Sequence, residues 1–374
     1  MSSSSGADLE KYFIPLDEIN RATDNFSRER YIGGGGFGGV YKGQLSERRQ
    51  NQTVAVKRLD ADSHQGNREF RVEMIIVYEY ASNGSLDHHL QDPNKMSCIT
   101  WAQRLEICIG AARGLHYLHS GLGEKHRVIH RDVKSANILL DDNMVAKICD
   151  FGLSKLGARN QPDTQRYTKV AGTQFYLDPS YLESGILQKE SDVYSFGVVL
   201  FEILSGMLVY SERRIGGERQ PLMNSVRRFH ENEPDKVVDP RIRDQIKSLS
   251  FETFKLTAYE CINFKKTDRP TLDTVIKKLE DALNFQIMFE TDQSAQTTTT
   301  GPSCCLPPPS LLVQSVYSNN HYQTSSLHRD YKSPPSPLDF LLFSKGTARL
   351  SIFVGNLSKK IIAKLSEMSK SLNL

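Results

Sequence analysis

The sequence has no apolar run that approaches the roughly 20 residues needed to span a bilayer, so no transmembrane helix is expected. Its first residues lack the apolar core of a signal peptide, and Ser2 stands where N-myristoylation requires a glycine. Six cysteines scattered over 374 residues do not make a disulfide framework. We therefore expect a soluble protein of the reducing cytosol.

Excess charge of one sign is also absent, because 47 Lys and Arg residues face 44 Asp and Glu residues, for a net charge of +3. A nucleic-acid-binding protein would show a clustered basic face, so nucleic acid is not an expected partner. With 39% hydrophobic and 24% charged residues, the chain can bury one large core or two lobes.

Composition divides the chain into regions. Residues 1–25 are an N-terminal extension, and residues 26–287 form the main domain, with a small β-rich lobe (26–81) and a larger helical lobe (82–287). Residues 288–374 contain TTTT, PPP and SPPSP, which cannot bury enough apolar surface, so this tail is predicted to be disordered. Apolar residues spaced by three and four predict one N-terminal helix packed on the main domain, namely Phe13, Leu16, Ile19, Ala22 and Phe26.

Two helices of the large lobe have recognisable ends. Thr100 followed by Gln103 predicts a capping box in front of an amphipathic helix. Ser191 is predicted to cap a second helix, apolar on nearly every side, that ends at Gly206. Asp192 would then be a buried carboxylate that needs a partner.

A glycine-rich segment, IGGGGFGGVYKG, places Gly33, Gly35 and Gly38 in a G-x-G-x-x-G array followed by Val40. Without Cβ atoms, such a hairpin can close over phosphates. The same array marks dinucleotide-binding folds, but there a helix should follow, and here the residues continue as a strand. Lys57 in VAVK lies on an alternating strand, from which its ammonium could reach phosphates. Plain turns and exposed lysines are the alternative interpretation of each motif.

The segments HRDVKSANILL and CDFG carry the chemistry. Asp132 can accept a hydroxyl proton, and Lys134 can balance charge on a transferring phosphoryl group. Asn137 and Asp150 supply the hard oxygen ligands that Mg²⁺ prefers. Taken alone, His130 would be a packed core histidine and DFG a turn, but the order and spacing of these motifs favour a phosphotransfer site.

Together these motifs resemble the eukaryotic protein kinases, and most closely the plant receptor-like kinases related to Pelle. The resemblance covers residues 12–287 through ATDNF, VYKG, VAVK, VYEY, NGSLDHHL, RLEICIGAARGLHYLH, VIHRDVKSANILLDD, KICDFGLSK, GTQFYLDP, KESDVYSFGVVLFEILSG and DRPT. It implies an α+β, bilobal protein kinase fold. The implied function is ATP-dependent transfer of γ-phosphate to Ser/Thr hydroxyls in signal transduction, by a receptor-like cytoplasmic kinase or a shortened product of a larger one.

The resemblance also implies site residues. Asp132 would be the catalytic base, assisted by Lys134 and Asn137, and Asp192 would anchor the catalytic loop. Mg²⁺ would be held by Asn137 and Asp150. The residues expected to bind ATP, with Tyr78 as gatekeeper and Glu79 to Ala81 as hinge, are Ile32, Gly33, Gly35, Gly38, Val40, Ala55, Lys57, Glu73, Tyr78, Glu79, Ala81 and Leu139.

Regulation and partners are implied in the same way. Because Arg131 precedes Asp132, phosphorylation should tune the activation loop, at one of Thr164, Tyr167, Thr168 and Thr173. Expected partners are ATP and protein substrates, with an upstream receptor kinase as a further candidate and at most peripheral membrane contact. The expected location is the cytoplasm, with the inner face of the plasma membrane as the alternative.

Two departures from the family pattern stand out. Asp178 occupies the position of a glutamate that normally pairs with Arg269, which predicts that this pair is missing or is formed by Glu183 instead. In REFRVEMIIVYEY, Glu73 and Tyr78 are five residues apart, where the family has roughly thirty.

The second departure predicts that half of helix C and one strand are missing, so that Glu73 pairs poorly with Lys57 and activity is impaired. Glu69, one turn earlier, is an alternative partner for the lysine. The alternative function is a nucleotide-binding pseudokinase or signalling scaffold.

Overall fold

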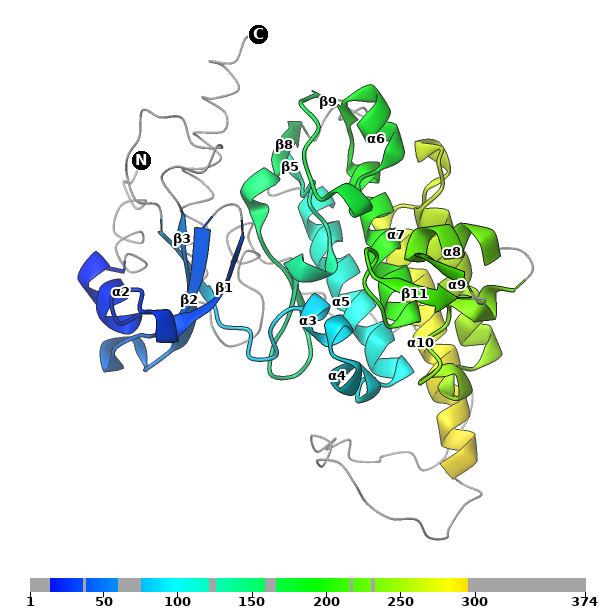
Figure 1. Cartoon of the computed structure of the whole chain (residues 1–374), viewed down its shortest axis with the longest axis horizontal. Helices are drawn as coiled ribbons and strands as arrows, with labels where there is room; N and C mark the ends of the chain where they lie inside the picture. Colours follow the sequence, from blue (N-terminus) through cyan, green and yellow to red (C-terminus); the bar gives the residue numbers. More distant parts are fainter. Residues whose placement is uncertain are drawn as a thin grey trace, which may run out of the picture.

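The computed structural model describes residues 14–35, 38–59, 75–120, 126–158, 166–215, 218–229 and 233–294. A small β-sheet lobe and a larger, mainly helical lobe lie side by side (Figure 1). This is the predicted α+β bilobal fold.

The small lobe is an antiparallel sheet, with four strands among the described residues in the order β1-β2-β3-β4. Its strands are β1 (Tyr31–Gly35), β2 (Gly38–Gln44), β3 (Thr53–Leu59) and β4 (Ile75–Glu79). Strand β4 begins where the apolar run predicted a strand and pairs directly with β3, with Val77 opposite Val56.

Helix α2 (Leu16–Ala22) packs on this sheet and contributes Ile19 and Ala22 to its buried core. The expected N-terminal helix is therefore present, but it is shorter than predicted. Leu16 is 50% exposed, and Phe26 lies beyond the helix, where it stacks edge-on against Tyr41. The helix ends because Asp24, Asn25 and Phe26 all have positive φ, which an α-helix cannot accommodate. Phe13 lies outside the described residues.

The large lobe is built around helices, which contact one another as antiparallel and crossing pairs (Figure 1). They are α3 (Leu86–Gln91), α4 (Pro93–Ser97), α5 (Trp101–Ser120), α6 (Pro179–Ser184), α7 (Lys189–Ser205), α8 (Leu222–Phe229), α9 (Ser248–Cys261) and α10 (Leu272–Ser294). Short antiparallel pairs join β5 (His126–Ile129) to β8 (Lys155–Ala158), β6 (Ile138–Leu140) to β7 (Ala146–Ile148), β9 (Arg166–Tyr167) to β10 (Ile186–Leu187), and β11 (Glu212–Ile215) to β12 (Glu218–Pro221).

Three ends of the two long helices were predicted, and two of the three are correct. Before α5, the backbone N–H of Thr100 donates to Gln103 and the N–H of Gln103 donates back to Thr100, which is the predicted capping box. Helix α7 ends at Gly206, whose φ is 62°. The predicted start of α7 is wrong, because the helix begins at Lys189. Ser191 lies inside the helix and donates its hydroxyl hydrogen to Asp178.

Helix α10 continues through the predicted domain boundary at residue 287 and ends at Ser294. Ile287 and Met288 are 43% and 66% exposed, so these two side chains contribute little to the core. The segment from residue 288 to 294 contains neither glycine nor proline, so its sequence has no strong helix breaker. Residues 295–374 lie outside the described part of the chain.

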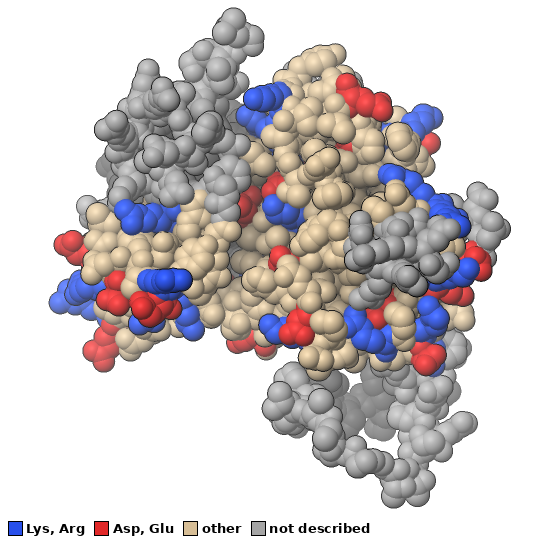
Figure 2. All heavy atoms as spheres, viewed as in Figure 1, with Lys and Arg blue, Asp and Glu red and all other residues tan. Residues whose placement is uncertain are grey.

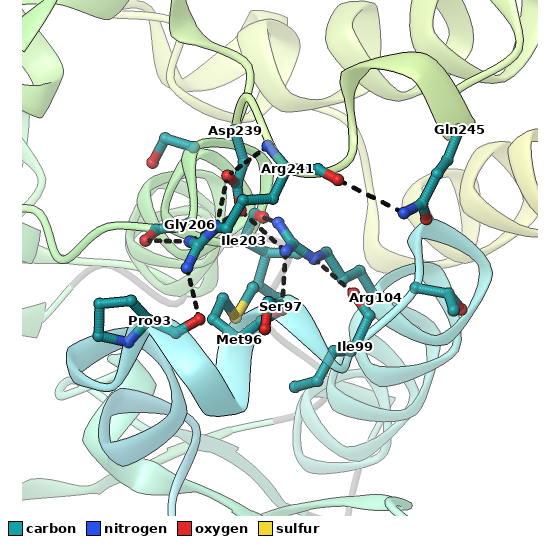
Figure 3. A network of polar contacts seen from close by, with 12 residues as sticks. Pro93, Met96, Ser97, Ile99, Arg104, Ile203, Gly206, Asp239, Arg241 and Gln245 are labelled. Atoms are coloured by element: carbon teal, nitrogen blue, oxygen red, sulfur yellow. Dashed lines mark hydrogen bonds and ion pairs between the residues drawn. The ribbon is translucent and has the colours of Figure 1, made fainter. Parts of the chain in front are cut away.

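A buried ionic network holds the helices of the large lobe together (Figure 3). Arg104 of α5 is fully buried and donates to Asp239 at 2.8 Å and to the carbonyl oxygens of Met96, Ile99 and Ile203. Arg241 binds the same carboxylate from the other side. The Arg104 guanidinium thus joins α4, α5 and α7 to the turn at residue 239.

The predicted loss of an ion pair at Arg269 is wrong. Asp178 itself accepts two hydrogen bonds from the Arg269 guanidinium, at 2.8 and 2.9 Å, and both side chains are fully buried. The shorter carboxylate reaches because Asp178 lies just before α6, where it also caps the helix through the N–H of Ser180. Glu183 is not needed for this pair.

No helix in the described ranges is both long and apolar enough to cross a membrane.

Candidate active site

The predicted site residues lie where the two lobes face each other. Figure 2 shows basic and acidic side chains close together in the hollow between the lobes. One wall comes from the strands of the small lobe, and the facing wall comes from the loops around β6 and β7.

The glycine-rich segment forms a hairpin of β1 and β2, in which Gly35 pairs with Gly38 and Gly33 with Val40. Gly38 has φ of 125°, a conformation that other residues rarely adopt, so glycine is required there. The chain continues as strand β2 rather than as a helix, which excludes the dinucleotide-binding alternative. The hairpin tip, residues 36–37, is outside the described part.

Lys57 lies in β3 between Val40 of β2 and Ile76 of β4. Its side chain is only 11% exposed, and its ammonium nitrogen lies 2.8 Å from Oδ1 of Asp150 in the large lobe. The sheet thus delivers a largely desolvated cation to the cleft. Glu73 and Glu69, the predicted partners of Lys57 in helix C, lie outside the described residues.

The catalytic-loop sequence is held from below by Asp192 of α7. Its carboxylate accepts hydrogen bonds from the backbone N–H of His130 at 2.7 Å and of Arg131 at 2.8 Å. The ring of His119 contacts the same carboxylate at 2.8 Å. This confirms that Asp192 anchors the loop and has the partners that its burial requires. Arg131, with φ of 72°, is one of the strained positions that this anchoring maintains.

Asp132 projects from this loop with 6% of its surface exposed. One carboxylate oxygen lies 3.0 Å from the Lys134 ammonium. The other accepts hydrogen bonds from the backbone N–H and the hydroxyl of Thr173, at 3.0 and 2.7 Å. Lys134 also donates to the Thr173 hydroxyl at 3.0 Å. A hydroxyl is therefore already seated between a carboxylate and an ammonium, which is the arrangement that proton acceptance from an alcohol requires.

Asn137 and Asp150 lie on neighbouring loops. The N–H of Cys149 donates to the Asn137 carbonyl, which ties the two loops together. The Asn137 side-chain nitrogen donates to the Asp132 carbonyl at 2.8 Å, so its amide oxygen is left for another ligand. Asp150 has φ of 61°, a conformation that turns its carboxylate towards Lys57.

This donor set fits a divalent cation bound together with phosphates. The described residues contain no cluster of three His, Cys, Asp or Glu side chains that could hold a metal alone. Mg²⁺ commonly uses one or two protein oxygens and takes its other ligands from substrate phosphates and water. The Asn137 and Asp150 oxygens match that requirement.

The remaining residues expected to bind ATP frame the connection between the lobes. Tyr78 lies opposite Ala55 in the β3–β4 ladder, and Glu79 is the last residue of β4. Leu139 of β6 forms a bridge with Ser85, just beyond Ala81. The hydroxyl of Tyr78 is buried, and this desolvation raises its pKa. The nearby Cys149 and Asp150 add to the shift. Ile32 is 41% exposed on β1.

The predicted phosphorylation positions have different surroundings. The Thr168 hydroxyl accepts a hydrogen bond from the Arg131 guanidinium at 3.2 Å, whereas Tyr167 is 82% exposed. Thr173 is bonded to Asp132, so a phosphate there would collide with the proposed base. Thr164 is not among the described residues.

A further group of residues was not predicted. The Tyr176 hydroxyl donates to Glu202 at 2.6 Å and contacts Ser135, which links the activation segment, α7 and the catalytic loop. Burial raises the pKa of Glu202 to about 7, although hydrogen bonds from Tyr176 and Val209 oppose the shift. The sequence feature that could have pointed to Glu202 is a glutamate in the apolar part of a helix. Gly172 was also missed, because only the fold shows that a Cβ there would lie 2.8 Å from the Arg131 carbonyl.

The fold and this arrangement define the class of phosphotransferases in which two lobes enclose a nucleotide. The protein kinase domain model matches residues 68–279, more than half of the chain, and the chain belongs to the protein kinase family. Protein kinases use ATP and a divalent metal ion and act on protein substrates.

Individual relatives are more specific. A probable receptor-like protein kinase from Arabidopsis thaliana is 42% identical over 316 residues, which cover 76% of this chain and 37% of that protein. Receptor-like protein kinase HERK 1 from the same plant is 43% identical over 300 residues, covering 74% of this chain and 35% of that protein. These matches confirm the predicted resemblance to plant receptor-like kinases. The chain spans little more than a third of the length of these relatives.

Proposed function

We propose that this chain transfers the γ-phosphate of ATP to serine and threonine hydroxyls of protein substrates in a signalling pathway. The observation that supports this most directly is the hydroxyl of Thr173, seated between the carboxylate of Asp132 and the ammonium of Lys134. A substrate serine or threonine hydroxyl would take the same position.

In this proposal each residue has one task. Asp132 orients the substrate hydroxyl and accepts its proton, and Lys134 offsets negative charge on the transferring phosphoryl group. Lys57 contacts the phosphates from above. Asn137 and Asp150 would hold Mg²⁺, which when bound neutralises phosphate charge. The glycine hairpin excludes water from the phosphates.

The direct test is transfer itself. Purified chain, incubated with Mg²⁺ and ATP and a mixture of Ser-, Thr- and Tyr-containing peptides, should phosphorylate the Ser and Thr peptides, as measured by mass spectrometry. Nucleotide binding without any transfer would contradict the proposal and favour the pseudokinase alternative. That alternative depends on the missing part of helix C, and the comparisons with proteins named as kinases do not favour it.

Among the phosphorylation candidates, we propose Thr168 as the activating one. A phosphate on its hydroxyl would gain a charge-assisted hydrogen bond with Arg131, which is bonded to Asp192 beside the base. Since such a bond contributes about 1.5–3 kcal/mol, Thr168→Ala should lower activity after preincubation with ATP by about tenfold or more. Tyr167→Phe is the matched control, because this side chain is exposed. Equal activity of both variants after preincubation would contradict this assignment.

We propose that a receptor kinase at the inner face of the plasma membrane activates this chain, because relatives of the chain carry receptor-like names. Cytoplasmic location with peripheral membrane contact fits that role.

A further inference from the structure

A second charged cluster joins the two lobes, away from the reacting groups. Lys147 of β7 lies 3.0 Å from Glu79 of β4 and 3.4 Å from Asp141, which follows β6. We call these three residues the hinge cluster. The proposed transfer mechanism uses neither Lys147 nor Asp141.

Each member of the hinge cluster is fixed to a rigid element. Glu79 ends β4 and lies opposite Val54 in the small sheet. Asp141 accepts hydrogen bonds from the N–H groups of Asn143 and Val145, both at 2.9 Å, so one oxygen holds the β6–β7 turn and the other faces Lys147. A short side-chain bridge between two rigid elements restrains their relative rotation.

Partial burial makes this bridge stronger than an ordinary surface pair. The side chains of Lys147 and Asp141 are 16% and 12% exposed, and that of Glu79 is 35% exposed. Fully exposed pairs contribute little because water screens them, whereas these charges are partly shielded. The lysine also contacts two carboxylates, one from each lobe, so its loss leaves both without this cation.

The hinge cluster is also close to the groups that bind nucleotide. Lys147 lies directly opposite Leu139 in the β6–β7 ladder, and Asp150 follows it by three residues. The Asn83 side chain donates to the Asp141 carbonyl at 2.6 Å, which attaches the connection between the lobes to the same turn. Lys57 and Asp150 form another charged contact between the lobes.

We propose that Lys147 is a positioning residue that holds the two lobes at the angle in which Lys57 faces Asp150. A nucleotide that binds between preoriented lobes does not have to restrict their rotation on binding. Lys147 therefore sets nucleotide affinity and residence time, while the transfer step depends on Asp132 and Lys134. This inference concerns the proposed kinase site and rests on its binding ATP.

The test uses the full chain with Lys147→Met, which keeps the length of the side chain and removes its charge. Without the charge of Lys147, the KM for ATP should rise by about 3- to 10-fold. Dissociation of a fluorescent ADP analogue should become faster by the same factor. The kcat should change by less than about twofold, because the reacting groups are untouched. Lys147→Arg should restore the wild-type dissociation rate, since the arginine guanidinium can reach both carboxylates.

Two further variants separate positioning from general stability. Lys278→Met removes an ion pair to Glu260 that joins α10 to α9 within the large lobe, and should leave dissociation unchanged. Glu79→Gln should speed dissociation, and combining it with Lys147→Met should add little, because both changes break one bridge.

The outcomes distinguish this inference from the proposed function. If the wild type binds the ADP analogue but transfers no phosphate, the proposed kinase function is wrong. The dissociation rate of the analogue still tests the role of Lys147 in that case. Unchanged dissociation in Lys147→Met, a lower melting temperature without faster dissociation, or full additivity with Glu79→Gln would each overturn the positioning role. Absence of nucleotide binding by the wild type would overturn both.

Discussion

Replacing Asp132 with asparagine is expected to reduce phosphoryl transfer by about 10²- to 10⁴-fold, the usual contribution of a general base, while leaving nucleotide binding unchanged. The amide retains the shape of the carboxylate, and its oxygen can still accept the hydrogen bond from the Thr173 N–H. It cannot take a proton from a substrate hydroxyl. The measurement is single-turnover transfer from ATP together with the dissociation constant of ADP.

Asp142→Asn provides the matched control, because it makes the same chemical change on an exposed side chain of the β6–β7 turn. This variant should transfer phosphate at the wild-type rate. Transfer by Asp132→Asn at that rate would show that Asp132 is not the base. Loss of nucleotide binding in the same variant would mean that the substitution damages the site itself.

Asp239→Asn is expected to lower the free energy of unfolding by about 3–5 kcal/mol, the range found when one partner of a buried ion pair is removed. Arg104 would then be a fully buried cation with only neutral carbonyl acceptors, and Arg241 would lose the negative charge that it now contacts. Urea denaturation measures the effect. Asp235→Asn, an exposed residue four positions earlier, should change stability little.

The same carboxylate predicts a pH dependence. Burial alone would raise the pKa of Asp239, but hydrogen bonds from Arg241 and Arg104 outweigh it and hold the pKa below its ordinary value of 3.8. A carboxyl group whose pKa is lowered by folding stabilises the folded state at pH values above its ordinary pKa. This stabilisation is lost as the pH falls through the pKa of the folded state. The stability difference between wild type and Asp239→Asn should therefore be constant near neutral pH and shrink below about pH 3.8. A difference that instead grows on acidification would contradict the assignment.

The sequence alone carried the identity of the fold and the chemistry of the candidate site. Asp132, Lys134 and Asn137 lie within six residues, so their chemistry is encoded locally, and the hairpin around Gly38 follows from a backbone that only glycine adopts easily. Strand β4 was predictable from its apolar, β-branched residues. Local patterns specify local structure because their interactions span one turn or one strand pair.

Local patterns were less informative about where elements begin and end. Ser191 has the right chemistry for a cap, but its hydroxyl donates to Asp178, and α7 starts two residues earlier. At the other end of the domain, α10 passes the predicted boundary at residue 287 because nothing in its composition stops a helix before Ser294.

Pairings between distant residues were decided only by the tertiary structure. Asp178 and Arg269 are 91 positions apart, and whether a carboxylate one methylene shorter than glutamate can reach the guanidinium depends on where α6 lies against α9 and α10. The hydrogen bond from Thr173 to Asp132 is a contact of the same kind. So are the ion pairs of Lys147 with Glu79 and Asp141. Sequence determined which chemical groups this protein has, because residue type fixes chemistry; only folding decided which of them meet, because distances between remote segments depend on the packing of the whole domain.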